Sequence, residues 1–345
     1  MKRKKYKKLL HDRRCLKFQK ATKKSCKNKK RINKRNRVED SNRSMSNRVQ
    51  KDAPSVFSFT ENQVETIDFF ADIIDEMKRK SFGKVFYINS SSVTAVSVDV
   101  LIYLIAIMQN ITINMQMHYS FIGNLPNDKN VAKVYHESGF MDYVSTRGKK
   151  LPDNNDKRRI EAGKRNDPII SGELCEFVMG KLGLDIKAIQ PIQKILIELM
   201  SNVYHHAYKK ENDDIMKKKW YIYAEYNGNS VKIIFVDTGV GIAKTVRKKF
   251  GEKIAGIFNT DIVKDSELIK STLLGEFRTE TLEPYRGNGL PGVYEQARMP
   301  LFSEFNILSG KGQCIVERDG SIACNEFENP ICGTIFVFSI VSERE

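Results

Sequence analysis

The chain has 345 residues and a formal net charge of +16, and this length is sufficient for two ordinary domains. Its longest fully apolar run, Val100–Met108, has nine residues, whereas a membrane-spanning helix needs about 20, so we expect no membrane span. No apolar segment with a cleavage site follows the charged N-terminus, which argues against secretion and favours the cytoplasm.

The positive charge is concentrated at the N-terminus. Residues 1–37 contain 19 Lys or Arg and one acidic residue, and the remainder of the chain is nearly neutral. We therefore predict that residues 1–52 form a basic, mostly disordered tail. Such a tail would suit a nucleic-acid backbone, an anionic membrane surface or an acidic partner, and a merely solubilising tail is the alternative. No base-reading motif accompanies the charge.

Residues 53–148 are predicted to form a small α/β domain, an open sheet with helices on one side. A strand is expected at Lys84–Ile88, followed by a polar loop and an apolar helix at Val98–Gln109. Strict alternation of apolar and polar residues over Ile111–Phe121 predicts a second strand with one buried face. A helix is predicted over Asp128–Ser138.

A polar segment with two prolines, residues 149–171, is typical of a linker. It leads to a second domain predicted over residues 172–345. The whole chain lacks the Gly-x-x-x-x-Gly-Lys-Ser/Thr sequence, which excludes a P-loop NTPase.

Six cysteines are present, and none is spaced as Cys-x-x-Cys. Three of them, Cys314, Cys324 and Cys332, lie around a hairpin predicted to turn at Asp319-Gly320. A zinc site there would need a fourth ligand, and no His is close in sequence. Buried thiols in strands are therefore favoured over a metal site.

The sequence ELMSNVYHHAY lies in a helix predicted over Gln190–Tyr208. Its apolar residues fill one continuous arc at helical spacing, and Glu198 and Asn202 sit together just outside that arc. An amide oxygen can ligate Mg²⁺, and a nearby carboxylate can act as a base. An ordinary exposed Glu/Asn pair is the alternative for this helix taken alone.

Two glycine-bearing turns and a strand follow. Val236-Asp-Thr-Gly-Val-Gly-Ile242 comes after an apolar strand, and an Asp at a strand end can accept a hydrogen bond from the amine of adenine. Arg286-Gly-Asn-Gly-Leu-Pro-Gly292 precedes a predicted helix, where backbone N–H groups favour phosphate. Gly333-Thr334 begins the last predicted strand. Each turn taken alone is also compatible with a plain loop.

Together these four motifs resemble the GHKL superfamily, which includes gyrase, Hsp90, histidine kinases and MutL. The resemblance covers residues 172–341 and implies a C-terminal Bergerat-fold α/β sandwich, a mixed sheet with helices on one face, that binds ATP and Mg²⁺. It implies that Glu198 is the catalytic base and that Asn202 holds Mg²⁺ on the ATP phosphates. Residues 243–285 would form a mobile lid. The other implied ATP-binding residues are Asp237, Gly239, Gly241, Gly287, Asn288, Gly289, Leu290, Gly292 and Thr334.

Within this superfamily the helix motif is most similar to anti-sigma-factor serine kinases. Val85–Ile107 resembles the STAS domain of their antagonists, which implies docking within the chain or onto a protein partner, and a homodimer is compatible with it. Val98 stands where the antagonists carry a phosphoacceptor Ser, and their glycine is absent. No transducer domain follows the last strand, so we expect no strand-passage function.

The leading hypothesis is a regulatory ATPase or serine/threonine kinase whose ATP state is coupled to partner binding. Hydrolysis, phosphotransfer and ATP as a conformational ligand all remain open. The alternatives are a non-catalytic ATP-gated module whose residues 1–37 bind nucleic acid, as in a defence or stress system, and a degenerate kinase that acts as a scaffold.

Overall fold

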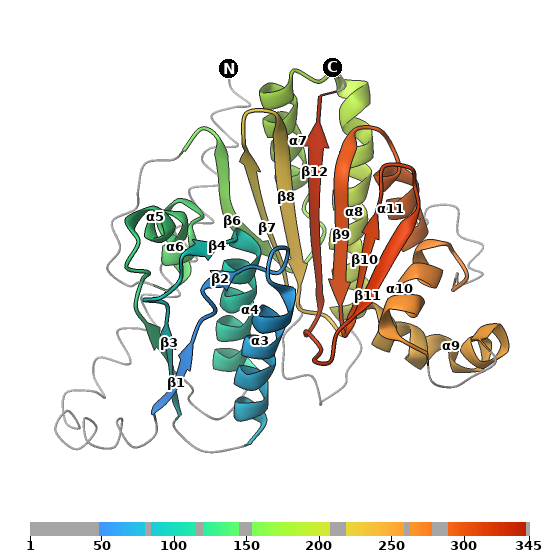
Figure 1. Ribbon diagram of the computed structural model, residues 1–345. Coiled ribbons are helices and arrows are strands. Elements are labelled where there is room, and N and C mark those ends of the chain that lie inside the picture. Colours follow the sequence, from blue (N-terminus) through green and yellow to red (C-terminus); the bar gives the residue numbers. More distant parts are fainter. Residues whose placement is uncertain are drawn as a thin grey trace.

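The computed structural model of the chain combines a small parallel sheet with a large antiparallel one (Figure 1). It describes residues 48–79, 84–114, 120–144, 154–207, 219–258, 263–277 and 289–342, with the backbone alone for 110–114 and 204–207. Residues 1–47 of the predicted basic tail lie outside the described residues. Among the described helices none is both long and apolar enough to cross a membrane.

The N-terminal unit, residues 48–144, contains a parallel three-stranded sheet in the order β1-β3-β5. Its helices lie beside this sheet, and a short parallel pair of strands, β2 and β4, lies next to the helices (Figure 1). The elements are β1 (Arg48–Asp52), β2 (Val56–Phe57), α3 (Gln63–Lys78), β3 (Val85–Asn89), β4 (Ala95–Val96), α4 (Val98–Asn114), β5 (Ser120–Gly123), α5 (Lys129–Glu137) and α6 (Phe140–Val144).

The strand predicted at Lys84–Ile88 and the helices predicted from Val98 and Asp128 are confirmed as β3, α4 and α5. Asp128 is the N-cap of α5, and its carboxylate accepts the N–H groups of Asn130 and Val131.

Two predictions for this unit are wrong. Residues 111–114 continue α4, so the predicted strand does not begin at Ile111. Its described part is β5, Ser120–Gly123, and residues 115–119 lie outside the described residues. No Gly or Pro interrupts the chain from Val98 to Asn114. Every side chain from Val100 to Ile107 is buried, so the sequence shows no alternation of apolar and polar residues with the period of a helix. Residues 48–52, assigned to the tail, form β1 because their backbone pairs with β3 although only Val49 is apolar.

The C-terminal sheet has seven strands in the order β11-β10-β9-β12-β8-β7-β6. Every neighbouring pair is antiparallel, which corrects the predicted mixed sheet. The reason is that β7–β8 and β9–β10–β11 are joined by short turns, which fix opposite directions, and β12 enters between β8 and β9. The strands are β6 (Lys157–Gly163), β7 (Trp220–Tyr226), β8 (Ser230–Asp237), β9 (Phe302–Ser309), β10 (Gly312–Val316), β11 (Ile322–Glu326) and β12 (Thr334–Val341).

Edge strand β6 lies inside the segment that its composition assigns to the linker. Its sequence, KRRIEAG, has a single large apolar residue, Ile160, so no alternating pattern marks it as a strand. Pairing with β7 orders it, with a register shift between Arg158 and Glu161.

One face of this sheet is covered by helices that share its larger core. They are α7 (Pro168–Leu182), α8 (Ile186–Ala207), α9 (Ile242–Phe258, kinked at Phe250), α10 (Asp265–Leu273) and α11 (Leu290–Ala297). The predicted helix from Gln190 is confirmed as part of α8. The predicted helices on one face of the sheet are thus present, and the other face is also covered.

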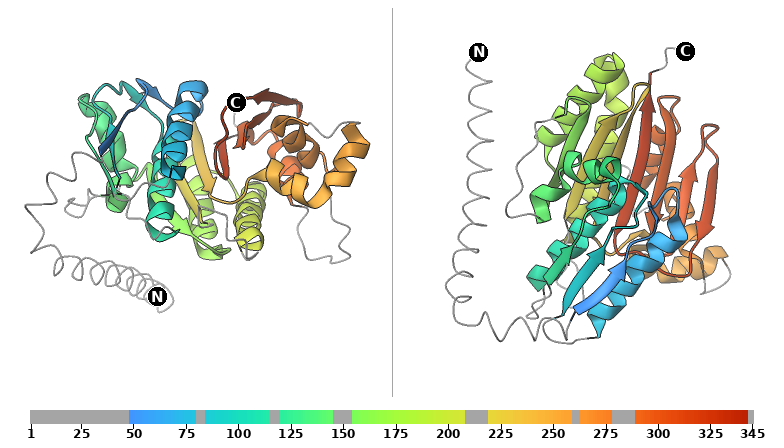
Figure 2. Two further views of the ribbon diagram at one scale, coloured as in Figure 1. Left: turned by 90° about the horizontal axis from the view of Figure 1, so that it is seen from below. Right: turned by 60° about the vertical axis from the view of Figure 1, so that its left-hand side comes forward.

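The N-terminal unit packs on that second face, and the views of Figure 2 show α3 and α4 across the sheet from α8. A single core cluster joins Phe59, Phe70 and Tyr103 of the unit to sheet residues. The sheet residues of that cluster are Ile160, Tyr221, Tyr223, Ile234, Val236, Leu308, Ile335 and Val337. The sheet is therefore the middle layer of a three-layer arrangement.

Candidate nucleotide site

Helix α8 carries the first two candidate residues at the margin of its buried face. Its apolar arc is buried as predicted, at Ile192, Ile195, Leu196, Leu199, Met200 and Val203. Glu198 and Asn202 are half-buried and lie four residues apart, so they occupy neighbouring positions on one side of the helix. Both side chains thus reach the edge of the core, where a polar group remains accessible to a ligand.

Glu198 lies beside the start of α11. A β-carbon at position 289 would be 3.9 Å from Glu198 Oε1, so the carboxylate and the second glycine turn are neighbours. Gly289 has a φ of +63°, a conformation that glycine adopts without strain, and it precedes the first helical residue, Leu290. Burial raises the pKa of Glu198 above its ordinary value. A carboxyl group with a raised pKa is the type of group that takes up a proton readily.

The first glycine turn holds the carboxylate of Asp237 at the end of β8. Asp237 Oδ1 accepts the N–H of Gly239 at 2.7 Å, and the Asp237 side chain is half-buried. A β-carbon at position 239 would lie 2.8 Å from that oxygen, so any other residue would displace the carboxylate. On β12, Thr334 is the direct neighbour of Asp237.

Ser309, at the end of β9, connects the start of α9 to the start of β12. Its Oγ accepts the N–H of Ile242 at 2.9 Å and lies 3.0 Å from the carbonyl oxygen of Gly333 and 3.1 Å from Thr334 Oγ1. Ser309 is fully buried. Because Gly241 has a φ of +88° and a β-carbon there would be 3.1 Å from Ser309 Oγ, the turn fits only with glycine.

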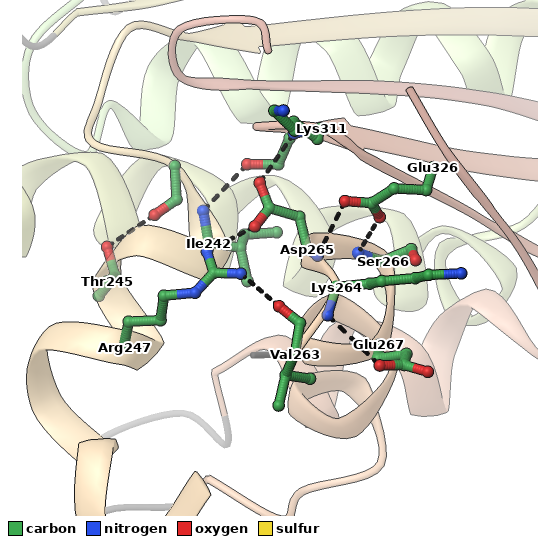
Figure 3. A network of polar contacts seen from close by, with 12 residues as sticks. Ile242, Thr245, Arg247, Val263, Lys264, Asp265, Ser266, Glu267, Lys311 and Glu326 are labelled. Atoms are coloured by element: carbon green, nitrogen blue, oxygen red, sulfur yellow. Dashed lines mark hydrogen bonds and ion pairs between the residues drawn. The ribbon is translucent and has the colours of Figure 1, made fainter. Parts of the chain in front are cut away.

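A polar network fixes the helices beyond this turn (Figure 3). Arg247 of α9 bonds to Asp265 and, at 2.6 Å, to the carbonyl oxygen of Val263. Asp265 also accepts the N–H of Lys311 at 2.8 Å. At the start of α10, the N–H groups of Asp265 and Ser266 donate to the Glu326 carboxylate at 3.1 and 2.9 Å.

This network bears on the segment predicted to be a lid, residues 243–285. Its described parts are the helices α9 and α10, and α10 buries Leu268, Ile269 and Leu273 in the core of the sheet. The described part of the segment is thus helical, with one helix fixed to the strands. Residues 259–262 and 278–288 lie outside the described residues, and so do the candidates Gly287 and Asn288.

The predicted site residues thus fall into two groups. Asp237, Gly239, Gly241 and Thr334 meet at the ends of β8 and β12. Glu198 and Gly289 meet between α8 and α11, with Leu290 and Gly292 in the first turn of α11 and Asn202 one helical turn from Glu198. Helix α9 starts from the first group and packs against α10, which in turn packs against α11.

Two residues of this region are absent from the sequence predictions, Ser309 and Glu326. Ser309 precedes Gly310 at a hairpin, and this pair indicates only a turn. Its position opposite Thr334 follows from strand register, which the sequence does not display.

A scan against protein-family models finds no match to this chain, and a search of the curated proteins finds no relative. Among the described residues, no group of three or more His, Cys, Asp or Glu side chains is arranged to hold a metal ion.

Proposed function

We propose that this protein binds Mg-ATP between α8 and the two glycine turns, as the resemblance to GHKL proteins implies. The observation that carries the proposal is the convergence of separate segments. Asp237 meets Thr334 at the strand ends, and Glu198 meets Gly289 between the helices. Segments far apart in the sequence are thus brought together in two pairs, which α9 and α10 connect.

In this proposal the Asp237 carboxylate accepts the exocyclic amine of adenine. The Gly239 N–H donates to Asp237 Oδ1 at 2.7 Å and orients the carboxylate at the strand end. The glycines at 239 and 241 leave room for the flat ring, since side chains there would collide with Asp237 and Ser309. Backbone N–H groups at the start of α11, from Gly289 onward, favour the phosphates.

The residues present fit a magnesium ion that arrives with the nucleotide. Mg²⁺ prefers oxygen ligands and commonly takes only one or two from the protein, with phosphates and water supplying the rest. Asn202 supplies an amide oxygen one helical turn from the Glu198 carboxylate. When bound, the ion would neutralise phosphate charge.

Glu198 is the proposed general base, which takes a proton from water or from a partner hydroxyl. Its burial favours the protonated form, which raises its pKa toward the working pH and suits proton transfer. Whether the acceptor is water or a protein serine or threonine decides between an ATPase and a protein kinase. A degenerate kinase scaffold would bind ATP without either reaction.

The N-terminal unit is the proposed route from ATP to a partner. Tyr103 of α4 accepts the N–H of Cys332 at 2.7 Å, directly before Gly333 and Thr334. Gln109 of α4 accepts hydrogen bonds from Lys219 at 2.9 Å and Tyr221 at 3.1 Å. A structural change at the strand ends would therefore alter these hydrogen bonds and so reach the N-terminal unit. Val98 has no hydroxyl group to phosphorylate, so switching by phosphorylation at that position is not proposed.

Calorimetric titration with Mg-ATP tests the binding proposal. We expect Asp237→Asn and Asn202→Ala to weaken binding about 10- to 100-fold, the loss of one hydrogen bond or ligand to a charged or polar group. Asn229→Ala, in the exposed β7–β8 turn, is the matched control and should leave affinity unchanged. Absence of binding heat with the folded full-length protein would refute the proposal.

Product analysis tests the role of Glu198. Glu198→Gln keeps the shape of the side chain and removes the base, so turnover should fall by about 100-fold or more while nucleotide binding persists. Glu295→Gln, exposed on α11, serves as control. Equal turnover in the Glu198 variant and the wild type would remove Glu198 from the mechanism. Absence of turnover in the wild type would favour the scaffold or the gated module.

A second candidate function, nucleic-acid binding, is favoured by the charge of residues 1–37. Binding of this kind releases counterions and falls steeply with salt. We expect deletion of residues 1–37 to abolish retention of a nucleic-acid duplex in a mobility-shift assay, and Mg-ATP affinity to be unchanged. Retention that survives the deletion, or that does not respond to salt, would contradict this function.

A further inference from the structure

Cys314 and Cys324 face each other across neighbouring antiparallel strands. They are direct partners in the register of β10 and β11, and both are thiols in the structure. Cys314 is fully buried, whereas Cys324 is half-buried and therefore reachable by a small molecule.

The hydrogen bonds at both ends of the hairpin show which type of pair this is. Phe327 N–H donates to the Lys311 carbonyl at one end, and Glu317 N–H donates to the Ser321 carbonyl at the other. Hydrogen-bonded pairs alternate along an antiparallel ladder, so the pairs 311/327, 313/325, 315/323 and 317/321 are of that type. The Cys314–Cys324 pair therefore belongs to the other type, whose side chains are closer.

This position suits a disulfide. Partners in a non-hydrogen-bonded pair have Cα atoms about 4.5 Å apart, and disulfides bridge Cα atoms about 4.4–6.8 Å apart. A bridge can thus form without separation of the strands.

The two thiols have unequal surroundings. The Cys314 thiol donates to the Ser266 carbonyl oxygen at 3.3 Å. Its hydrogen bond with Cys324 and its burial raise the pKa of Cys314. The neighbouring Cys314 thiol and, to a smaller extent, Lys270 lower the pKa of Cys324. When Cys324 is a thiol, the Cys314 S–H can donate to the Ser266 carbonyl oxygen. When Cys324 is a thiolate, the Cys314 S–H can donate to the Cys324 sulfur instead. Cys324 is thus the nucleophile and Cys314 the resolving thiol.

We propose that Cys314 and Cys324 form a reversible disulfide in response to a peroxide, a modification site that does not depend on nucleotide binding. The Cys324 thiolate attacks one oxygen of hydrogen peroxide, breaks the O–O bond and becomes a sulfenic acid, with hydroxide as the leaving group. The Cys314 sulfur then attacks the Cys324 sulfur. An S–S bond forms, and the hydroxyl leaves as water with the Cys314 proton. An external thiol reduces the bridge by exchange.

The bridge would act on α10 through contacts already in place. Cys314 gives up its hydrogen bond to Ser266 when its thiol proton is lost. Two residues from Cys324, Glu326 accepts the N–H groups of Asp265 and Ser266. Both strands of the hairpin therefore contact the start of α10, and the bridge would change one of these contacts.

Peptide mapping of the full-length chain with Cys15→Ser and Cys26→Ser tests the proposal. These changes leave four of the six thiols and prevent bridges through the basic N-terminal segment. After hydrogen peroxide, a maleimide block under denaturing conditions and non-reducing digestion, we expect a linked Cys314–Cys324 peptide and two fewer free thiols. Dithiothreitol added to the oxidised protein before the maleimide block should restore all four free thiols.

Three variants in this background sharpen the result. Cys314→Ser should leave a sulfenic acid on Cys324 that dimedone traps, and Cys324→Ser should lose no thiol. Cys332→Ser, which removes a half-buried cysteine on the other face of the sheet, should still give the bridge. Absence of the linked peptide in the parent protein, or linkage of Cys324 to Cys175 or Cys332, would overturn the proposal even if a core variant fails to fold.

Discussion

At the scale of single residues, the buried hydroxyl of Ser309 holds the start of α9 and the start of β12 at the candidate site, and a buried carboxyl group lies beneath the opposite face of the sheet. Ser309 has no charge, yet it connects the start of α9 to the start of β12. Asp99, at the start of α4, is almost fully buried under the other face of the sheet. Each group makes a separate prediction.

Ser309→Ala should destabilise the protein. It leaves the buried N–H of Ile242 without its acceptor, which costs about 1–3 kcal/mol of unfolding free energy. Ser303→Ala on the same strand is the control, because its hydroxyl makes only a 3.4 Å bond to the Ser339 carbonyl. Urea unfolding of both variants checks this, and equal midpoints would contradict the assigned role of Ser309.

Asp99→Asn should change how stability depends on pH. Burial raises the pKa of Asp99 to about 6, although Ser97 and Lys232 of β8 oppose the rise. The folded state therefore binds the Asp99 proton more tightly than the unfolded state, so the contribution of Asp99 to stability is fully present below about pH 4 and is lost as the pH rises through about 6.

The loss over this window is on the order of 2–3 kcal/mol, from a pKa difference of about two units. The side chain introduced by Asp99→Asn does not titrate in this window. The unfolding free energy of the wild type, measured in urea relative to that of Asp99→Asn, should therefore fall by this amount as the pH rises. A parallel pH dependence of the two proteins would exclude Asp99 as the source.

At the scale of elements, α4 is the helix that joins the two sheets. Tyr103→Phe removes the acceptor for the Cys332 N–H next to β12, and we expect a loss of about 1–3 kcal/mol in urea unfolding. Tyr87→Phe on β3 is the control, since its ring keeps the stacking with Arg48. If the proposed coupling holds, Tyr103→Phe should also weaken Mg-ATP binding, and Tyr87→Phe should not.

At the scale of the whole molecule, the shared core makes the seven-stranded sheet depend on the N-terminal unit. A chain of residues 154–345 would expose large side chains such as Tyr221, Tyr223 and Val337 on the uncovered face. We expect it to be insoluble or to bind hydrophobic dyes, and the full chain to unfold in one cooperative transition by circular dichroism and fluorescence. Two well-separated transitions would show that the units fold independently.

Local chemistry explains which parts of the fold could be predicted. The helix from Asp128, the strand at Lys84–Ile88 and the apolar arc of α8 each depend on nearby residues, and the structure contains all three. The strands β1 and β6 were missed because backbone pairing, not apolar periodicity, orders them.

The candidate site also has a part that could be predicted from the sequence and a part that could not. Its residues were chosen by type and spacing. Glu198, Asn202 and Asp237 carry oxygen atoms that can bind a metal ion or accept a hydrogen bond wherever the fold places them. Their neighbours were not predictable, because Gly289 reaches Glu198 through helix packing and Ser309 reaches Thr334 through strand register.

The sequence by itself determined the local turns, the helix faces and the set of polar groups, since each is decided within a few residues. Only the tertiary structure decided that all neighbouring strands of the large sheet are antiparallel, that both faces of the sheet are covered, and that Cys314 meets Cys324. Those outcomes depend on contacts between segments far apart in the chain, where the burial of apolar surface selects one arrangement among many that local preferences allow equally.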